Sequence, residues 1–285
     1  MIEAKELDYH PQGDLLTSRV AGLARQILPE GAKDILRQVV RNERAKYPLK
    51  DPFVADLGGF SARFWIRNHT DWYRIGSKDS EGHFAEDLIS TVASSGGAFV
   101  DIGAAQGYYS IIAAKAQAQV YAIDPDPVSL RSIGENIALN PDVQARITVL
   151  PVALGNEDGE ISLFLDKSGK YAPSLKRTVH GLGDETRVKV SRLDTLVDRG
   201  IVPIPEVIKI DVEGAEGMVI EGMRKILASE SKPKHIFLEI HRSYLPLFGG
   251  NPAGLNQSLV DCGYFLPKDN IWSRRNEILC HFVAK

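Results

Sequence analysis

Residues 100–110, VDIGAAQGYYS, decide the fold of this chain of 285 amino acids. Asp101 ends a short apolar run typical of a buried strand, and Gly103 and Gly107 mark a tight bend that enters a helix. A strand that turns sharply into a helix presents backbone N–H groups and the positive end of the helix dipole to a ligand. Ala105 occupies the place of the middle glycine of a nicotinamide-binding loop, which reads G-x-G-x-x-G. The bend therefore predicts a ligand that has less need of a loop for binding pyrophosphate. This ligand should also carry a group that interacts favourably with the carboxylate of Asp101.

Strand and helix patterns alternate on both sides of this bend. Strand patterns fall at 98–103, 119–124, 146–154, 206–214 and 234–241, and helix patterns fall at 83–97, 107–118, 127–140 and 217–229. Alternation at this spacing is typical of βαβ units and a parallel sheet. Two further strand patterns, at 264–272 and 277–285, suit a final antiparallel strand. Residues 156–166 predict a hairpin that turns at Asp158–Gly159.

The region before this core has a different composition. Residues 1–50 carry apolar positions at helical spacing and predict two helices, and the aromatic stretch 60–75 predicts an antiparallel pair of strands. We therefore predict an N-terminal helical and hairpin extension over residues 1–75. Residues 76–285 are predicted to form a Rossmann-like three-layer α/β domain, with a mainly parallel sheet and an antiparallel final strand.

Composition and charge exclude several kinds of protein. The net charge of −3 and the pI of about 6.2 argue against bulk electrostatic capture of a nucleic acid, so no nucleic-acid partner is expected. Cys262 and Cys280 lie in no metal-binding spacing, which argues against zinc and disulfides and favours a reducing, cytoplasmic location. The sequence shows no signal peptide and no apolar run long enough to span a bilayer, so no membrane partner is expected.

A second acidic residue supports the interpretation of the bend. Asp124 ends the next predicted strand, where a carboxylate can accept hydrogen bonds from both hydroxyls of a ribose. Pro125 follows it and fixes the turn, although Asp124 could instead cap the next helix. S-adenosylmethionine has a ribose and an α-ammonium but no phosphate, so Asp101 suits its ammonium and Asp124 its ribose. The two residues together predict S-adenosylmethionine as the cofactor.

The order of motifs carries a resemblance to a known family. Between residues 96 and 245 the chain carries, in this order, VDIGAAQGYYS, AIDPDP, VALGNEDGEISLF, RLDTLVD, IKIDVEGAE and IFLEIH. This series resembles the FkbM family of S-adenosylmethionine-dependent methyltransferases, and IKIDVEGAE after RLDTL is its most specific part. The resemblance implies a class I methyltransferase fold and an enzyme that methylates a hydroxyl of a sugar or small natural product.

The resemblance also implies which residues hold the cofactor. It places Ala153 where the adenine edge is held and Asp211 next to the transferring methyl group. Gln106 stands where the family often carries Asn and keeps an amide, and Tyr108 either covers the cofactor or packs into the core. We therefore predict these cofactor-binding residues: Asp101, Gly103, Gln106, Gly107, Tyr108, Asp124, Pro125, Ala153 and Asp211.

Ionisable residues crowd the ends of two other predicted strands. Asp211, Glu213 and Glu216 follow one strand, and Glu239 and His241 end the next. Strand side chains alternate, so members of each group that are two residues apart are expected to share a face at the carboxyl edge of the sheet. An alcohol acceptor must lose a proton, and imidazole has the unperturbed pKa closest to neutrality. We predict His241 or Asp211 as the general base and Glu239 as the residue that orients the acceptor.

Several roles in this cluster stay open. Glu216 could serve only as a charge at a helix N-terminus, Glu213 as a cap, and His241 as an ordinary strand-end histidine. The carboxylates could alternatively hold a divalent cation, although the prediction for the chain is that it binds no metal.

Two other functions compete with methyl transfer. A nicotinamide-dependent oxidoreductase would share the fold, but the missing middle glycine and the IKIDVEGAE block count against it. A non-catalytic module would bind a partner through residues 1–75, which could also pair two chains, but the intact Asp101, Asp124 and Asp211 count against it. The arginines and aromatic residues of 63–74 suit either a half-buried hairpin or stacking against a sugar. The acceptor is predicted to be a small molecule or a saccharide.

Overall fold

The computed structural model describes residues 48–76, 82–165, 175, 184–273 and 276–285. The two helices predicted near the N-terminus therefore lie outside the described residues. The chain forms two compact units, residues 1–53 with 65–80 and residues 54–64 with 81–285. The domain boundary expected between residues 75 and 76 stays a prediction. None of the described helices is both long and apolar enough to cross a lipid bilayer.

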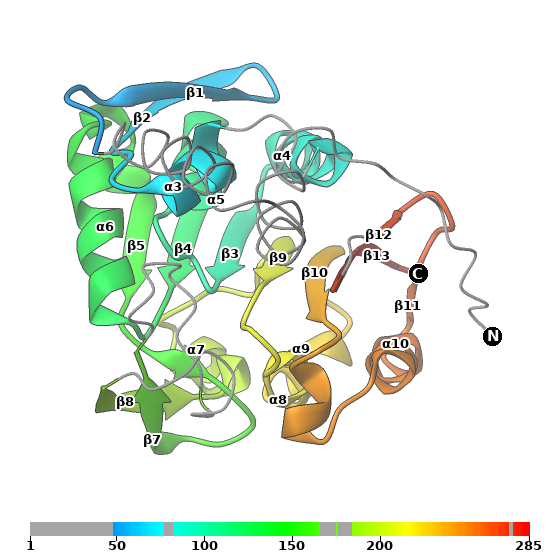
Figure 1. Cartoon of the computed structure of the whole chain (residues 1–285). Helices are drawn as coiled ribbons and strands as arrows, with labels where there is room; N and C mark the ends of the chain where they lie inside the picture. The colour runs from blue at the N-terminus through cyan, green and yellow to red at the C-terminus, as the bar shows by residue number, and fades with distance from the viewer. Residues whose placement is uncertain (1–47, 77–81, 166–174, 176–183, 274–275) are drawn as a thin grey trace, which may run out of the picture. The chain divides into compact units, whose positions relative to one another are not determined.

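An eight-stranded sheet organises the larger unit (Figure 1). Its strands are β3 (Ala98–Ile102), β4 (Gln119–Ile123), β5 (Ile147–Leu150), β9 (Val207–Ile210), β10 (His235–His241), β11 (Tyr264–Phe265), β12 (Ile271–Ser273) and β13 (Glu277–Ala284). Their order is β11-β13-β10-β9-β3-β4-β5, and β12 pairs with β13. The five strands from β10 to β5 run parallel, and β13 pairs antiparallel with β10. The predicted α/β class, with a mainly parallel sheet and an antiparallel final strand, is confirmed.

Helices connect these strands as the alternating pattern predicts. In chain order they are α4 (Gly82–Ser95), α5 (Tyr108–Lys115), α6 (Pro127–Ala138), η2 (Pro141–Arg146), α7 (Leu193–Asp198), α8 (Glu216–Glu221), α9 (Arg224–Leu227), η3 (Leu245–Phe248) and α10 (Pro252–Asp261). The start of α6 follows from its sequence, because the Asp126 side chain accepts hydrogen bonds from the N–H groups of Val128 and Ser129. Asp126 therefore caps this helix, and Asp124 does not.

The helix expected over residues 217–229 is two short helices, α8 and α9. Gly222 lies between them and packs against Gly155, where a Cβ on residue 222 would stand 1.8 Å from the Gly155 backbone oxygen. Asp194, from the RLDTL segment, accepts hydrogen bonds from two backbone N–H groups of α9, both at 3.0 Å. The break between the two helices therefore lies where two distant segments contact the chain.

A three-stranded sheet overturns the hairpin predicted at Asp158–Gly159. Its strands are β6 (Ala153–Leu154), β7 (Gly159–Phe164) and β8 (Glu185–Ser191). The central strand is β8, which pairs parallel with β6 and antiparallel with β7, so β6 and β7 are not partners. Asp158 instead accepts hydrogen bonds from the hydroxyls of Ser191 and Thr195, at 2.5 and 2.7 Å. Pairing with a strand about 30 residues further along the chain outweighs the local turn preference.

The antiparallel pair predicted in the aromatic stretch begins earlier than expected. It consists of β1 (Phe53–Leu57) and β2 (Phe60–Phe64), and the two glycines between them have φ angles of 59° and 83°. The rest of the stretch forms α3 (His69–Asp71) and a π-helical turn, η1 (Trp72–Gly76). The glycines set the turn, and the residues after Phe64 do not form the second strand.

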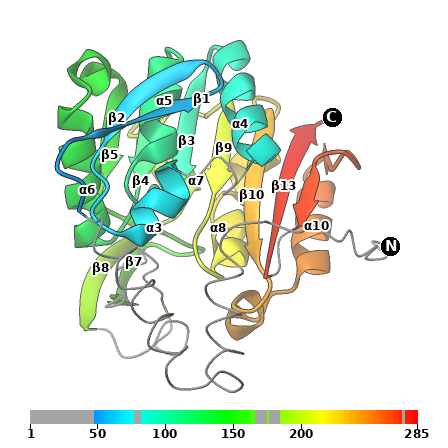
Figure 2. The same ribbon diagram turned by 45° about the horizontal axis from the view of Figure 1, so that its top comes forward.

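The main hydrophobic cluster occupies one face of the large sheet. It takes Ile102, Ile210 and Leu238 from neighbouring strands and packs them with residues of α7 to α10. Figure 2 shows β4, β3, β9 and β10 side by side in this sheet. Because strand side chains alternate, Asp101 and Lys209 lie on the opposite face from their neighbours Ile102 and Ile210.

The order of strands switches at β3, because its two neighbours in the sheet come from different parts of the chain. The next strand, β4, lies on one side of β3, and the much later β9 lies on the other. In open α/β sheets, ligands bind outside the carboxyl ends of the strands at such a switch. The segments after β3 and β9, which carry Gly103 and Asp211, therefore frame the expected binding region.

Candidate active site

The bend after β3 is held directly against the end of β9. Gly103 has a φ of 79°, and a Cβ there would stand 1.8 Å from the backbone oxygen of Asp211, so only glycine fits. The N–H of Gly103 donates to the Ile123 carbonyl at 2.9 Å, which ties the bend to β4. Gly107, with a φ of 77°, adopts a left-handed conformation just before α5. The bend that the sequence predicts is present, and it joins the ends of three strands.

Asp101 lies beneath this bend and is only 1% exposed. Its Oδ2 accepts a hydrogen bond of 2.6 Å from Ser110, whereas its Oδ1 has no hydrogen-bond partner among the described residues. The Nζ of Lys209 lies 4.0 Å from Oδ1. Burial raises the pKa of Asp101, and the nearby ammonium and the hydrogen bond from Ser110 oppose this rise. The unsatisfied oxygen fits a ligand that supplies a cationic donor.

Asp124 organises the loop on the other side of the bend. Its Oδ2 accepts a hydrogen bond from the N–H of Ala105 and its Oδ1 one from the N–H of Asp126, both at 2.9 Å. Ala105 has a φ of 49°, a conformation that residues other than glycine rarely adopt, and this hydrogen bond helps to hold it. Burial raises the pKa of Asp124 to about 7. Each carboxylate oxygen keeps a second lone pair, so Asp124 can still accept a hydrogen bond from a ligand hydroxyl.

The other predicted cofactor residues come from different parts of the structure. Gln106 is buried, and its carbonyl accepts a hydrogen bond of 2.9 Å from a side-chain amide of α6. Tyr108 is half-buried, with its ring centroid 5.4 Å from that of an aromatic ring of β2. Pro125 is half-buried next to Asp124, whereas Ala153 is buried in β6 of the small sheet. Gln106 and Tyr108 thus lie at the bend, whereas Ala153 belongs to the three-stranded sheet.

A second polar cluster stands at the ends of β9 and β10. His241 is 4% exposed, and its Nδ1 lies 2.6 Å from Oε1 of Glu216. Its Nε2 lies 3.5 Å from a carboxylate oxygen of Glu213 and 3.7 Å from one each of Asp211 and Glu239. The structure therefore brings together the three predicted acceptor-site residues and surrounds one imidazole with four carboxylates.

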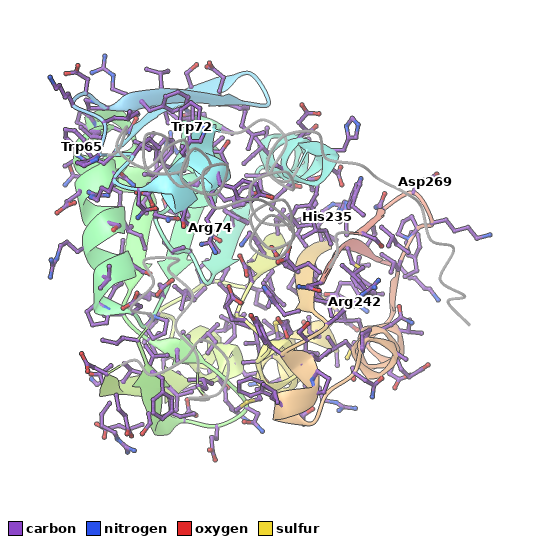
Figure 3. The ribbon with its side chains drawn as sticks, viewed as in Figure 1. Trp65, Trp72, Arg74, His235, Arg242 and Asp269 are labelled. Carbon is purple, nitrogen blue, oxygen red and sulfur yellow. The ribbon has the colours of Figure 1, made fainter. Side chains whose placement is uncertain are left out.

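Strand β10 fixes the histidine side of this cluster. Glu239 and His241 are two residues apart on one strand, and unbroken pairing with β13 holds both in register. In Figure 3, the labelled His235 and Arg242 mark the two ends of β10, and the cluster lies at the Arg242 end. This is the carboxyl end, where the switch in strand order predicts the ligand.

The turn between β9 and α8 positions the acidic residues in a way that the sequence does not predict. β9 ends before the acidic residues begin, and Glu213 has a left-handed φ of 52° instead of an extended conformation. Gly214, with a φ of 104°, packs so closely on Tyr244 that a Cβ would stand 2.7 Å from the Tyr244 Cβ. Glu216 is fully buried and accepts a hydrogen bond from the N–H of Gly214 at 3.0 Å. A strained turn, rather than strand alternation, aims Glu213 at His241.

The protonation of His241 follows from these neighbours. Burial by itself lowers the pKa of His241. The hydrogen bond to Glu216 and the three other carboxylates outweigh burial and raise the pKa of the imidazole well above its ordinary value. Near neutral pH the imidazole therefore carries its proton when nothing else is bound.

Sequence reasoning missed Lys209, which links the two clusters. Its side chain is 3% exposed, and its Nζ lies 3.2 Å from Oδ2 of Asp211 and 4.0 Å from Oδ1 of Asp101. The Nζ also lies 5.2 Å from the ring centroid of Tyr109. Lysine is almost never fully buried unless it is paired. A lysine inside the apolar run of β9 was therefore the signal that could have identified it.

Three residues of the second cluster also meet a geometric condition for binding a cation. Asp211, Glu239 and His241 each offer a ligand atom, and these atoms lie within 4.8 Å of one another. The alternative that the carboxylates hold a divalent cation therefore has a defined set of ligands. The first cluster, at the bend, offers hydrogen-bond acceptors for an ammonium and for hydroxyls. The second cluster, at the ends of β9 and β10, offers groups that can bind and deprotonate a second molecule.

Comparison with known proteins agrees with this chemistry. Residues 101–266 match the family model described as the methyltransferase FkbM domain. The hexuronic acid methyltransferase AglP of Haloferax volcanii is 28% identical over 205 residues, which cover 70% of this chain and 78% of that protein.

Two solved structures give weaker similarities. The methyltransferase FkbM from Methylobacillus flagellatus is 18% identical with a TM-score of 0.46, and the match covers 66% of this chain and 44% of that chain. The fibrillarin pre-rRNA processing protein of Methanococcus jannaschii is 13% identical with a TM-score of 0.46, over 83% of this chain and 84% of that chain. The family model, which matches more than half of the chain, carries the assignment, and these structures do not.

Proposed function

The chain belongs to the FkbM family of methyltransferases, and from this premise we propose that it transfers the methyl group of S-adenosylmethionine to a hydroxyl of a saccharide. The family match runs from the end of β3 to β11 and includes both polar clusters. It does not favour the nicotinamide-dependent oxidoreductase or the non-catalytic module. The saccharide is proposed because the Haloferax relative is named for methylation of a hexuronic acid.

One observation carries the proposal. The close approach of Gly103 to Asp211 joins the bend after β3 to the acidic end of β9, at the switch in strand order. A methyl donor in the bend and a hydroxyl at the acidic end would then be neighbours. Methyl transfer requires this proximity, because the acceptor oxygen, the methyl carbon and the sulfur must lie in line.

The residues of the bend fit the donor. Asp101 has an unsatisfied oxygen that suits the α-ammonium, and Asp124 retains lone pairs for the ribose hydroxyls. Gly103 and Gly107 allow the donor to approach the backbone. We propose that Gln106, Tyr108, Pro125 and Ala153 complete the donor site, with Asp211 at the methyl end.

The transfer itself exchanges one bond for another. The acceptor oxygen forms a bond to the methyl carbon while the carbon–sulfur bond breaks, and the electron pair of that bond goes to sulfur, which gives S-adenosylhomocysteine. The hydroxyl proton must go to a base. We propose Asp211 as this base, since its side chain is 19% exposed and His241 already carries a proton. Glu239 is proposed to orient the acceptor.

Three other expectations remain proposals. A cytoplasmic location and the lack of a nucleic-acid partner rest on composition and charge, and the pairing of two chains rests on the helices predicted in residues 1–75.

The proposal is tested in two steps. Calorimetry with S-adenosylhomocysteine should show one binding site per chain, and NADH should not bind. Transfer of a radiolabelled methyl group should then occur to a saccharide that contains a hexuronic acid, and not to the same saccharide with all of its hydroxyls already methylated. Lack of S-adenosylhomocysteine binding at millimolar concentration, or binding of NADH instead, would overturn the proposal.

A further inference from the structure

We infer that Asp211, Glu239 and His241 form a binding site for a divalent metal ion. The inference that this ion holds two adjacent hydroxyls of the acceptor saccharide rests on the proposed function. The metal site itself rests only on the geometry of the side chains.

The orientation of His241 is the first argument. Its side chain is 5% exposed, and Nε2 makes no hydrogen bond among the residues that the structure describes. The carboxylate oxygens in front of it stand at 3.5 to 3.7 Å, beyond the usual hydrogen-bond length of about 2.7 to 3.2 Å. A metal ion about 2.0 to 2.2 Å from each ligand bridges two atoms at this separation. The imidazole thus directs its second nitrogen toward carboxylate oxygens at separations that one ion can bridge.

The partner of the other imidazole nitrogen is the second argument. Nδ1 lies 2.6 Å from Oε1 of Glu216, which is fully buried. Histidines that bind metals commonly donate their second ring N–H to a carboxylate, which fixes the tautomer and the ring orientation. The same Oε1 accepts a hydrogen bond from the N–H of Gly214, which holds the carboxylate in place beside His241. With the Nδ1 proton held by Glu216, Nε2 provides its lone pair to the ion, which replaces the proton there.

The rigidity of the ligand set is the third argument. Glu239 and His241 come from one strand that is paired on both sides, with β9 and β13. Asp211 follows β9 directly, and its backbone oxygen is pressed against Gly103. The ligands therefore come from two hydrogen-bonded neighbouring strands, and they need little rearrangement to bind an ion.

The ligand types indicate which ion and which role. Two carboxylates and one imidazole suit Mn²⁺ or Mg²⁺ better than a soft metal, because no thiolate is present in the set. Three protein ligands leave coordination positions for other oxygen atoms. Adjacent hydroxyls of a saccharide can fill two of them, and a bound ion lowers the pKa of a coordinated hydroxyl. His241 then acts as a ligand, and a neighbouring carboxylate takes the hydroxyl proton.

Electron paramagnetic resonance with Mn²⁺ alone tests the site without any acceptor. The full chain, freed of metals by a chelator, is expected to bind one Mn²⁺ tightly, and the Glu239→Gln variant should bind it at least about tenfold more weakly. Glu160→Gln, on the exposed edge of β7, is the matched control and should bind Mn²⁺ like the unaltered chain. Binding of S-adenosylhomocysteine by all three proteins shows that each is folded.

The outcomes separate this inference from the proposed function. Lack of Mn²⁺ binding at millimolar concentration, or equal affinity in Glu239→Gln and the unaltered chain, overturns the metal site. Full methyl transfer in the presence of excess chelator also overturns it, while leaving the proposed function intact. Tight Mn²⁺ binding without any binding of S-adenosylhomocysteine supports the metal site and contradicts the proposed function.

Discussion

Gly103 lies so close to Asp211 that a Cβ on residue 103 would stand 1.8 Å from the backbone oxygen of residue 211. This contact fixes the bend after β3 against the end of β9. It explains why the loop needs glycine for two separate reasons, the positive φ and the lack of space. The two polar clusters are joined through this contact.

Replacing this glycine should damage both stability and donor binding. We expect Gly103→Ala to lower the free energy of unfolding by about 2 to 4 kcal/mol, because it combines backbone strain with a steric clash. S-adenosylhomocysteine affinity should fall at least about tenfold. Gly134→Ala is the matched control, since residue 134 lies inside α6 with open space around it, and it should stabilise the chain by about 0.5 to 1 kcal/mol. Thermal unfolding and calorimetry measure both effects, and a Gly103→Ala variant as stable as the Gly134→Ala one would contradict this account.

Lys209 is expected to be essential for the stability of the fold, although its charged side chain is almost fully buried. Lys209→Met nearly keeps the length of the side chain but removes the ammonium between Asp101 and Asp211, which leaves the buried Asp101 carboxylate and the half-buried Asp211 carboxylate without their cation. Removing one partner of a buried pair costs about 3 to 5 kcal/mol. Lys225→Met, which breaks an exposed pair with Asp198, should change stability by less than about 1 kcal/mol. Urea unfolding of the two variants compares them, and equal effects would show that Lys209 is not held by charge.

Asp124 should make both donor binding and stability depend on pH. Its pKa is about 7 in the folded chain against 3.8 for the free side chain, so the folded state binds the proton more tightly. The contribution of Asp124 to the free energy of unfolding is therefore fully present below about pH 4 and is lost as the pH rises to about 7. The carboxylate form accepts hydrogen bonds from the ribose, so donor affinity should weaken as the pH falls below about 7.

The Asp124→Asn variant separates these effects from those of other groups. It cannot ionise at this position, so its donor affinity should be lower and should lack the change near pH 7. Calorimetric titrations at several pH values compare the two proteins. An unchanged pH profile in Asp124→Asn would assign the dependence to another residue.

The acceptor end should be separable from the donor end by substitution. Asp211→Asn and His241→Ala are each expected to lower turnover at least about tenfold, since each removes a group that contacts the acceptor or its base. Calorimetric binding of S-adenosylhomocysteine should survive in both variants. If both variants kept full turnover, neither residue would act as the base or as a ligand in the reaction.

Much of the fold could be predicted because its signals are local. The glycines and Asp101 around the bend after β3, and the alternation of apolar strands and helices, define β3, α5 and β4 from short stretches of sequence. The antiparallel final strand also followed from the order of elements, whereas its pairing with β10 did not. The hairpin predicted at Asp158–Gly159 was wrong because the partner of β7 is not local. It is β8, which lies further along the chain.

The sequence predicted which residues belong to the acceptor end of the candidate site, but it did not predict their geometry. Asp211, Glu239 and His241 were identified from their positions at the ends of two strands, and they do come together. The left-handed conformation of Glu213 depends on the turn that Tyr244 packs against, which is not visible in the sequence of that turn. Lys209 was missed because its partners come from other strands.

The sequence by itself determined the strands and helices around the bend after β3 and the chemical groups at the strand ends, since both depend on residues close together in the chain. Only the tertiary structure decided that Glu216 binds Nδ1 of His241, that Lys209 lies between two aspartates, and that Nε2 faces the carboxylates of Asp211, Glu213 and Glu239. These contacts join residues from separate strands and turns. Their energies depend on distance and burial, which exist only once the sheet has assembled.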